Sequence, residues 1–384
     1  MTTDHDPPQV RHLLLIRLDN MGDVLMCTPA MRALRQTYPQ AKITLLTSPS
    51  GAQLQPHLDL VDEVIVHRAS WVAVGPDQRP DSEQALVAQL QRAEIDAAIL
   101  FTTATQSALP MALLCRMAGI PIRLAHSREN PYGLLSHWVR DTEQVKQGMR
   151  HEVDRQLALV QTLGVTRPDD DRLAFHVRPQ DHEEAQALLL HQGLPPGRPY
   201  VVFHPGATAA SRRYPPERFG EVADQLTQEG WPCVFAAGHG EQDLVAQALA
   251  QTQHPVIDLT GKLSLGGLAA LIQGARLLIG NNSGAMHIAA AVGTPVVCLY
   301  ALTNPQHTPW RVPSQVLNHW VDCCHCLRSV CPHTHHACLR GVPPQRVLHA
   351  ATTLLDLMAH PDPDSRTPPV FHIGREQHGL PCQT

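Results

Sequence analysis

The chain has 384 residues, of which 43% are hydrophobic and 17% charged, the composition of an ordinary globular protein with enough length for two domains. Its formal net charge of −5 argues against wholesale binding to nucleic acid or anionic lipid, because both attract basic surfaces. The sequence has no apolar run of membrane-spanning length, and its polar N-terminus lacks a signal-peptide pattern. We therefore expect a cytoplasmic protein whose ten cysteines are mostly thiols.

The first half of the chain alternates short apolar runs with helical patterns. The run His12–Leu18 has the length of a strand, and after a glycine-containing loop the apolar spacing predicts a helix over residues 25–39. Further strands are predicted over residues 42–48, 61–67 and 96–101. This alternation is typical of βαβ units with a buried parallel sheet.

The pattern restarts in the second half, with a helix predicted over Pro179–Gly193 and a last helix over Pro344–His360. A boundary near Phe175–Pro179 gives an N-terminal domain 1–176, a C-terminal domain 177–360 and a loose, proline-rich tail 361–384. The predicted class is α/β, with two Rossmann-like, doubly wound domains that face a cleft. Four segments follow predicted strands and are expected at that cleft: Asp19–Asp23, His204–Arg213, Gly238–Asp243 and Gly280–His287.

The segment Gly280–His287 has the pattern of a phosphate site. A helix that begins near Gly284 offers unpaired N–H groups, Ser283 adds a hydroxyl, and His287 lies about one turn further on. The alternative is that Asn282 or Ser283 only caps the helix and His287 packs in the interior. The sequence pattern leaves these two interpretations evenly balanced.

The segment His204–Phe219 joins a Pro-Gly turn to small and hydroxyl residues and an arginine pair. Thr208 can donate a hydrogen bond to a phosphoryl oxygen, and Arg212 can neutralise a departing diphosphate. The alternative is a surface loop with solvated arginines. This segment gains weight because the predicted phosphate site lies in the same domain.

Near the N-terminus, Asp19 and Asp23 flank Gly22 in the loop after the first strand. The spacing does not match the G-x-G-x-x-G pattern of dinucleotide sites. A carboxylate at this position can act as a general base toward the cleft. A helix N-cap without chemistry is the commoner role for such an aspartate.

Taken together, these segments resemble glycosyltransferase family 9, the ADP-heptose:lipopolysaccharide heptosyltransferases. The residues that carry the resemblance are "RLDNMGDVLMCTPAMRALRQTYP" near the N-terminus, "HPGATAASRRYPPERF" and "GHGEQD" in the middle, and residues 259–310 in the second half. They follow the family's order and span most of residues 13–310. The set is specific, although each segment alone is not.

The resemblance implies a GT-B fold and inverting sugar transfer that needs no bound metal for catalysis. It places the acceptor, a lipid-linked saccharide, on the N-terminal half and an ADP-heptose-like nucleotide sugar on the C-terminal half. It implies no nucleic acid partner and at most peripheral contact with the cytoplasmic face of a membrane. The residues it marks are Asp23 as catalytic base, Gly284 and His287 at the phosphates, Thr208 or a neighbour on the donor, and Glu241 near the nucleoside. The residue patterns themselves add Asp19 and Gly22 on the acceptor side and Arg212, Asn282 and Ser283 on the donor side.

The chain departs from the family pattern at two donor positions. Arg212 stands where the family usually has Lys, and Asn282 stands where it usually has Asp. Arginine keeps the charge but forks differently, whereas asparagine keeps the shape and loses the charge. These changes leave open which sugar and which nucleotide base the donor carries. They also leave two alternatives, a nucleotide-sugar epimerase or hydrolase on the same scaffold, and a non-catalytic sugar-nucleotide-binding protein.

Residues 323–338 form an insert that holds five of the ten cysteines. Cys323 and Cys326 make a C-x-x-C pair, and Cys331 and Cys338 follow among several histidines. These residue types suit a structural zinc site, although the second half lacks a regular ligand spacing. Free thiols or a disulfide that pins a surface loop are the alternatives. The insert is expected near the donor end of the cleft.

Overall fold

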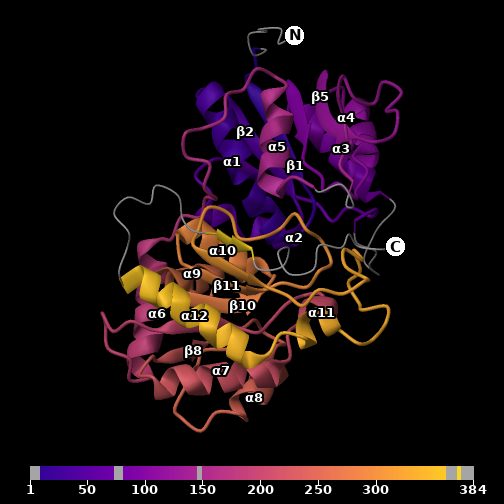
Figure 1. The fold of residues 1–384 in the computed structure, drawn as a ribbon. Helices are drawn as coiled ribbons and strands as arrows, with labels where there is room; N and C mark the ends of the chain where they lie inside the picture. Colours follow the sequence, from indigo (N-terminus) through magenta and orange to yellow (C-terminus); the bar gives the residue numbers. More distant parts are fainter. Residues whose placement is uncertain (1–8, 73–80, 145–148, 360–369, 373–384) are drawn as a thin grey trace. The chain divides into compact units, whose positions relative to one another are not determined.

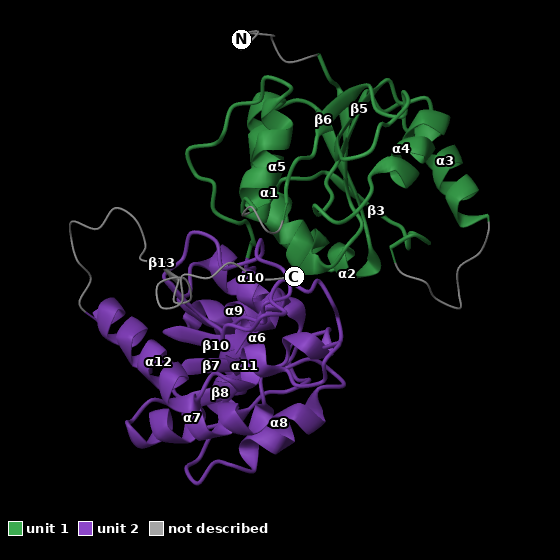
Figure 2. Ribbon diagram, turned by 45° about the vertical axis from the view of Figure 1, so that its right-hand side comes forward, with its two compact units in different colours: residues 1–176 green, residues 177–384 purple. Residues whose placement is uncertain are grey.

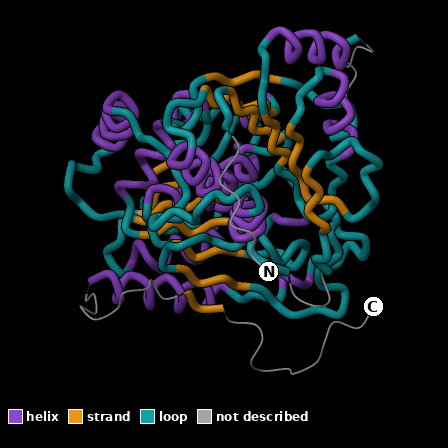
Figure 3. The backbone as a smooth tube through the Cα atoms, turned by 90° about the horizontal axis from the view of Figure 1, so that it is seen from above, coloured by secondary structure: helices purple, strands orange, loops and turns teal. Residues whose placement is uncertain are grey.

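The computed structural model describes residues 9–72, 81–144, 149–359 and 370–372. The chain divides into two compact units, residues 1–176 and 177–384 (Figure 2). Each unit is built around its own parallel sheet, with the strands of a sheet lying side by side (Figure 3). Among the described residues, no helix is both long and apolar enough to cross a membrane.

Unit 1 contains a six-stranded sheet in the order β3-β2-β1-β4-β5-β6. Helices α1 and α5 pack against each other, as do α3 and α4 (Figure 1). The strands are β1 (His12–Arg17), β2 (Lys42–Thr47), β3 (Glu63–Val66), β4 (Ala97–Leu100), β5 (Ile122–Ser127) and β6 (His137–Arg140). The helices are α1 (Met21–Thr37), α2 (Pro49–Ala52), α3 (Ser82–Arg92), α4 (Leu109–Met117) and α5 (Glu152–Gln161), with a 3-10 turn over Gln55–His57.

Unit 2 contains a seven-stranded sheet in the order β13-β12-β11-β10-β7-β8-β9. Helices α6, α9 and α10 pack in one group, and α7 packs with α8 and α12. The strands are β7 (Val201–His204), β8 (Cys233–Phe235), β9 (Ile257–Asp258), β10 (Leu277–Asn281), β11 (Val296–Leu299), β12 (Ser314–Leu317) and β13 (Val370–His372). The helices are α6 (Pro179–His191), α7 (Pro216–Gln228), α8 (Gln242–Leu249), α9 (Leu265–Gly274), α10 (Gly284–Val292), α11 (Ala337–Arg340) and α12 (Pro344–Ala359), with a 3-10 turn over Ala210–Arg212.

The central strands form because their residues are apolar on both faces. All six residues of β1 and all five of β10 are buried, as expected for parallel strands covered by helices on both sides. In each sheet the chain first adds strands on one side of the first strand and then crosses to the other side. This reversal creates a switch point between β1 and β4 in unit 1 and between β7 and β10 in unit 2. Ligands in doubly wound folds bind at the carboxyl ends of strands at such points.

One prediction about the tail is wrong. Within the predicted loose segment 361–384, residues 370–372 form β13, which pairs in parallel with β12. The open edge of β12 offers unpaired backbone groups, and the Val-Phe pair in this stretch has high strand propensity. The remainder of that predicted tail, residues 361–369 and 373–384, lies outside the described residues.

A buried histidine on β5 makes the stability of unit 1 depend on pH. His126 is 4% exposed, and its Nε2 lies 3.2 Å from the carbonyl oxygen of Arg155. Burial, reinforced by the nearby Arg155 charge, lowers the pKa of His126 to about 4. An unfolded histidine titrates near pH 6.5, so the unfolded state takes up this proton first as the pH falls.

We therefore predict that the free energy of unfolding falls by about 3 kcal/mol between pH 6.5 and pH 4 because of His126. His126→Gln keeps a donor for the carbonyl group and should flatten this slope in urea unfolding curves recorded from pH 7 to pH 4. Replacing the exposed His191 with Gln is the control and should leave the slope unchanged. An equally steep slope in His126→Gln would contradict the assignment.

Candidate active site

Unit 1 is organised around a guanidinium group inside its sheet. Arg17 ends β1 and is fully buried, and its Nε lies 2.8 Å from Asp19 Oδ2. Its Nη1 lies 2.7 Å from Glu152 Oε1, and its Nη2 lies 3.4 Å from Asp23 Oδ1. A buried arginine needs such partners, because an uncompensated charge in the interior is strongly unfavourable. Arg17 therefore fixes three carboxylates at the carboxyl end of β1.

Of the two aspartates predicted here, Asp23 lies in the first turn of α1. Its Oδ2 accepts a hydrogen bond from the backbone N–H of Asn20 at 3.2 Å, which is one half of a capping box. Asn20, and not Asp23, is therefore the N-cap of α1, and Asp23 supports that cap from the third helical position. Its side chain is 14% exposed, so the cap does not close it off from solvent. Gly22 is buried beside it in the same turn.

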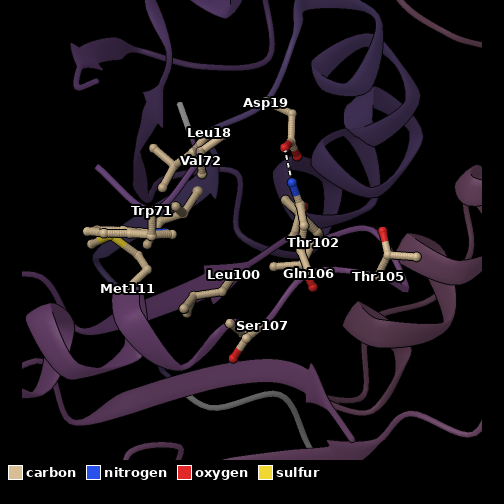
Figure 4. Close-up of a pocket in the computed structure, with 13 residues that line it drawn as sticks. Leu18, Asp19, Trp71, Val72, Leu100, Thr102, Thr105, Gln106, Ser107 and Met111 are labelled. Carbon is tan, nitrogen blue, oxygen red and sulfur yellow. Dashed lines mark hydrogen bonds between the residues drawn. The ribbon is translucent and has the colours of Figure 1, made fainter. Parts of the chain in front are cut away.

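Asp19 faces a pocket that the sequence did not reveal. Gln106 Nε2 donates a hydrogen bond to Asp19 Oδ1, and both residues line a cavity of about 230 Å³ (Figure 4). Burial raises the pKa of Asp19, and the Asp23 charge adds to this, while the Arg17 charge opposes it. Asp23 is not part of the lining of this cavity.

In unit 2, two neighbouring amide side chains, Asn281 at the end of β10 and Asn282 directly after it, have different surroundings. Asn281 is buried; its Oδ1 accepts the N–H of Tyr214 at 3.0 Å and its Nδ2 donates to the Pro205 carbonyl at 2.7 Å. It therefore fastens the loop after β7 to β10. The next residue, Asn282, is 2% exposed, and its Nδ2 makes no hydrogen bond of standard geometry among the described residues, although the amide lies close enough to the Tyr300 hydroxyl to oppose the rise of its pKa.

The N-terminus of α10 lacks the side-chain cap that the sequence admitted. Ser283 occupies the N-cap position, but its hydroxyl makes no capping hydrogen bond. That buried oxygen also has no partner within the part of the chain that the structure describes. Gly284 begins α10, and His287 is buried one turn later. A nine-residue helix therefore presents an uncapped N-terminus at the switch point of its sheet, which is the geometry of an anion site.

The loop after β7 supplies the predicted basic and hydroxyl groups. Thr208 is exposed, and Arg212 is half-buried at the end of a 3-10 turn. Arg213 instead serves the loop itself, since its Nε donates to the Ala207 carbonyl at 2.8 Å. Burial raises the pKa of Tyr300, the first residue after β11, and this rise is partly offset by Arg212 and Asn282. The side chains of Arg212 and Asn282 therefore lie near the hydroxyl group of Tyr300. Tyr300 was not predicted from the sequence.

Glu241 follows β8 at the start of α8, and its carboxylate makes a hydrogen bond within its own loop. Its Oε2 accepts the N–H of Gly238 at 2.9 Å at the start of α8. The carboxylate lies so close to Gly206 that a Cβ atom there would come within 2.2 Å of Oε2. Gly206 therefore has to be a glycine for Glu241 to reach the turn after β7.

The cysteine-rich insert, residues 323–338, forms hydrogen bonds with the loops that follow β7 and β11. Ser211, next to Arg212, donates its N–H to the Ser329 carbonyl at 3.0 Å and its hydroxyl to the Arg328 carbonyl at 2.8 Å. The loop after β11 is held in the same way, because Thr303 accepts the N–H of Leu327 at 2.9 Å. The insert thus fixes the backbone on either side of the α10 N-terminus.

The predicted metal ligands gather only in part. Cys323 Sγ lies 3.8 Å from His335 Nε2. Burial raises the pKa of Cys323 and of Cys338, and the nearby thiols of Cys326 and Cys331 add to both shifts. In the described ranges, however, no three Cys, His, Asp or Glu side chains are arranged to hold a metal ion. These four cysteines carry free thiols, whereas the neighbouring Cys324 is disulfide-bonded. A structural zinc site stays a prediction.

A family model described as glycosyltransferase family 9 (heptosyltransferase) matches residues 84–337. The chain belongs to this family. It is 29% identical to lipopolysaccharide heptosyltransferase 2 of Escherichia coli K12 over 89% of this chain and 98% of that protein. It is 30% identical to lipopolysaccharide heptosyltransferase 3 of the same strain over 76% of this chain and 82% of that protein.

A solved structure of a heptosyltransferase also has a fold similar to that of this family 9 glycosyltransferase. The structure of E. coli ADP-heptose lps heptosyltransferase II matches with a TM-score of 0.70 and 25% identity, over 91% of this chain and 99% of that one. The predicted α/β fold of GT-B type, the family and glycosyltransferase activity are therefore confirmed. The roles of the individual site residues remain predictions.

The buried arginine gives a test of the site's construction. Arg17→Met removes the cation that the fully buried Glu152 contacts at 2.7 Å and that also pairs with Asp19 and Asp23, so we expect a loss of about 3–5 kcal/mol in the free energy of unfolding. Arg172→Met removes an exposed pair with Asp170 and should cost less than about 1 kcal/mol. Urea unfolding measures both. If Arg17→Met and Arg172→Met lowered the free energy of unfolding equally, the Arg17 cluster would contribute no more to stability than an exposed ion pair.

Proposed function

We propose that this family 9 enzyme is an inverting heptosyltransferase that moves a heptose from ADP-heptose to the inner core of lipopolysaccharide. The observation that carries the donor half of the proposal is the uncapped N-terminus of α10, where Ser283 and Asn282 hold buried polar atoms that make no hydrogen bond of standard geometry among the described residues. Buried polar groups are normally satisfied, so these atoms suit a ligand. The E. coli relatives named heptosyltransferases 2 and 3 support the sugar and the acceptor.

In the proposed reaction, Asp23 removes the proton from the acceptor hydroxyl as the new bond to the anomeric carbon forms. The anomeric carbon becomes oxocarbenium-like, and its configuration inverts because the hydroxyl attacks opposite the leaving diphosphate. The N-terminus of α10 receives the diphosphate, with Ser283, His287 and Arg212 stabilising its charge. These groups supply the positive field that the reaction needs without a metal ion.

The remaining predicted residues complete the donor side. Thr208 donates to the diphosphate, and Glu241 contacts the nucleoside from the start of α8. Asn282 stands where the family usually has Asp, so we propose that it donates its amide N–H groups to a donor oxygen. A carboxylate at that position would only accept hydrogen bonds.

The acceptor determines where the enzyme works. We propose that it acts in the cytoplasm at the inner face of the cytoplasmic membrane and meets a lipid-linked saccharide there through peripheral contact. An epimerase or hydrolase on the same scaffold would instead turn over the nucleotide sugar without an acceptor. Release of ADP from ADP-heptose only when a core acceptor is present would therefore favour transfer.

The donor site predicts a nucleotide preference that calorimetry can measure with ADP, UDP, GDP and CDP in metal-free buffer. We expect ADP to bind best, and Ser283→Ala or His287→Ala to weaken it about 10- to 100-fold, the range for hydrogen bonds to charged groups. His254→Ala removes a surface histidine of the same unit and should change the Kd less than twofold. Preference for another base would move the enzyme to a different donor. No nucleotide binding would refute the phosphate site.

The two roles offered for Asp23 can be separated by comparing two substitutions. Asp23→Asn keeps an oxygen for the N–H of Asn20 but loses basicity and its charge toward Arg17, so kcat should fall by about 10²- to 10⁴-fold. Asp23→Ala loses the oxygen as well and should unfold about 1 kcal/mol more easily than Asp23→Asn. Acceptor-dependent ADP release and urea unfolding give the two readouts. Near-normal turnover in Asp23→Asn would leave Asp23 with a role in the capping box only.

A further inference from the structure

The pocket of unit 1 lies where a doubly wound sheet binds ligands. Leu18 and Asp19 follow β1, and Thr102 and Gln106 follow β4, so the lining comes from the two strands that flank the switch point. The cavity of about 230 Å³ is smaller than most ligand pockets, which begin near 300 Å³. It therefore suits one small ring and not a whole nucleotide sugar.

The two sides of the pocket differ in chemistry. Trp71 and Met111 lie together on one side, whereas Asp19 and Gln106 meet on the other (Figure 4). Trp71 is half-buried and offers an aromatic surface to the cavity. An apolar plate opposite converging polar groups matches a sugar ring, which has an apolar C–H face and hydroxyl groups at its edge.

The polar side is already held in place. Asp19 Oδ2 is bound by Arg17 Nε at 2.8 Å, and Asp19 Oδ1 accepts from Gln106 Nε2. Gln106 Oε1 in turn accepts the N–H of Thr103 at 3.2 Å, which fixes its amide. A carboxylate has about four acceptor positions, so Asp19 can still accept hydrogen bonds from ligand hydroxyls.

These groups also exclude other ligands. The carboxylate of Asp19 repels a phosphate or an acidic sugar placed against it. An acyl chain would cover Asp19 without offering a donor, which leaves a buried charge poorly solvated. A neutral sugar avoids both penalties.

We propose that this pocket holds one uncharged sugar ring of the acceptor, with its C–H face on Trp71 and its hydroxyls on Asp19 and Gln106. The inference rests on the proposed function, because it takes the acceptor to be a saccharide. It also connects the pocket to the base, since the guanidinium of Arg17 contacts both Asp19 and Asp23. Asp19 then positions the acceptor and Asp23 takes its proton.

The test uses the full-length enzyme with ADP-heptose and a deacylated, heptose-containing core oligosaccharide. Trp71→Ala should raise the KM for the oligosaccharide about tenfold or more and leave the KM for ADP-heptose and the Kd for ADP unchanged. Asp19→Asn should also raise the oligosaccharide KM. Trp71→Phe keeps an aromatic plate and should remain within about threefold of the wild type.

Trp138→Ala is the matched control, because it removes a tryptophan of the same unit that does not line the pocket. Thermal unfolding of each variant identifies any loss of fold. If Trp71→Ala is unfolded, the oligosaccharide KM of Trp71→Phe is the deciding measurement, and a rise well above threefold would contradict the proposal. An oligosaccharide KM that is unchanged in folded Trp71→Ala, or raised equally by Trp138→Ala, would overturn the pocket proposal. Absence of ADP binding in the wild type would instead refute the proposed function itself.

Discussion

The ion pairs of Arg17 are the constraint on which the structure of unit 1 depends. The sheet places a guanidinium at the buried end of β1, and the interior tolerates it only because Asp19, Asp23 and Glu152 surround it. Through these contacts one side chain ties β1 to the first turn of α1 and the first turn of α5. The pocket and the proposed base are therefore held by the same group, and neither can shift without disturbing the other.

Unit 2 holds its loops in place with hydrogen bonds between neutral groups. Asn281 joins β10 to the turn after β7, and the insert 323–338 holds the loops that carry Arg212 and Thr303. The insert has little apolar packing of its own, since Leu327 and Val330 are exposed. Its value to the enzyme lies in its backbone carbonyl and N–H groups, which fix flexible loops beside the α10 N-terminus. The disulfide bond of Cys324 adds a covalent constraint to this insert.

The sequence predicted most of the fold, because buried parallel strands and amphipathic helices leave clear periodicities. It missed β13, a short edge strand whose pairing depends on β12 and not on its own pattern. It also singled out the segment Gly280–His287, whose phosphate-binding role stays a prediction, but it could not separate Asn281 from Asn282, since both are amides at the end of one strand. Trp71 and Gln106 were missed for a related reason: they lie about 30 residues or more from any motif and reach the pocket only through the topology of the sheet. Arg17 had a signal that went unused, a charge inside an otherwise apolar strand.

The contrast between adjacent residues shows how the structure separates architecture from function. Both ends of the Asn281 amide form hydrogen bonds with the backbone of the neighbouring loop. The buried Nδ2 of Asn282, in contrast, makes no hydrogen bond of standard geometry among the described residues. In unit 1, Asp19 retains acceptor positions that face a cavity. Groups that complete the fold have their hydrogen bonds made before any substrate arrives. Groups whose bonds are still unmade at a switch point are left for the ligand, and this criterion brings together Asn282, Ser283 and Asp19 from two separate sheets.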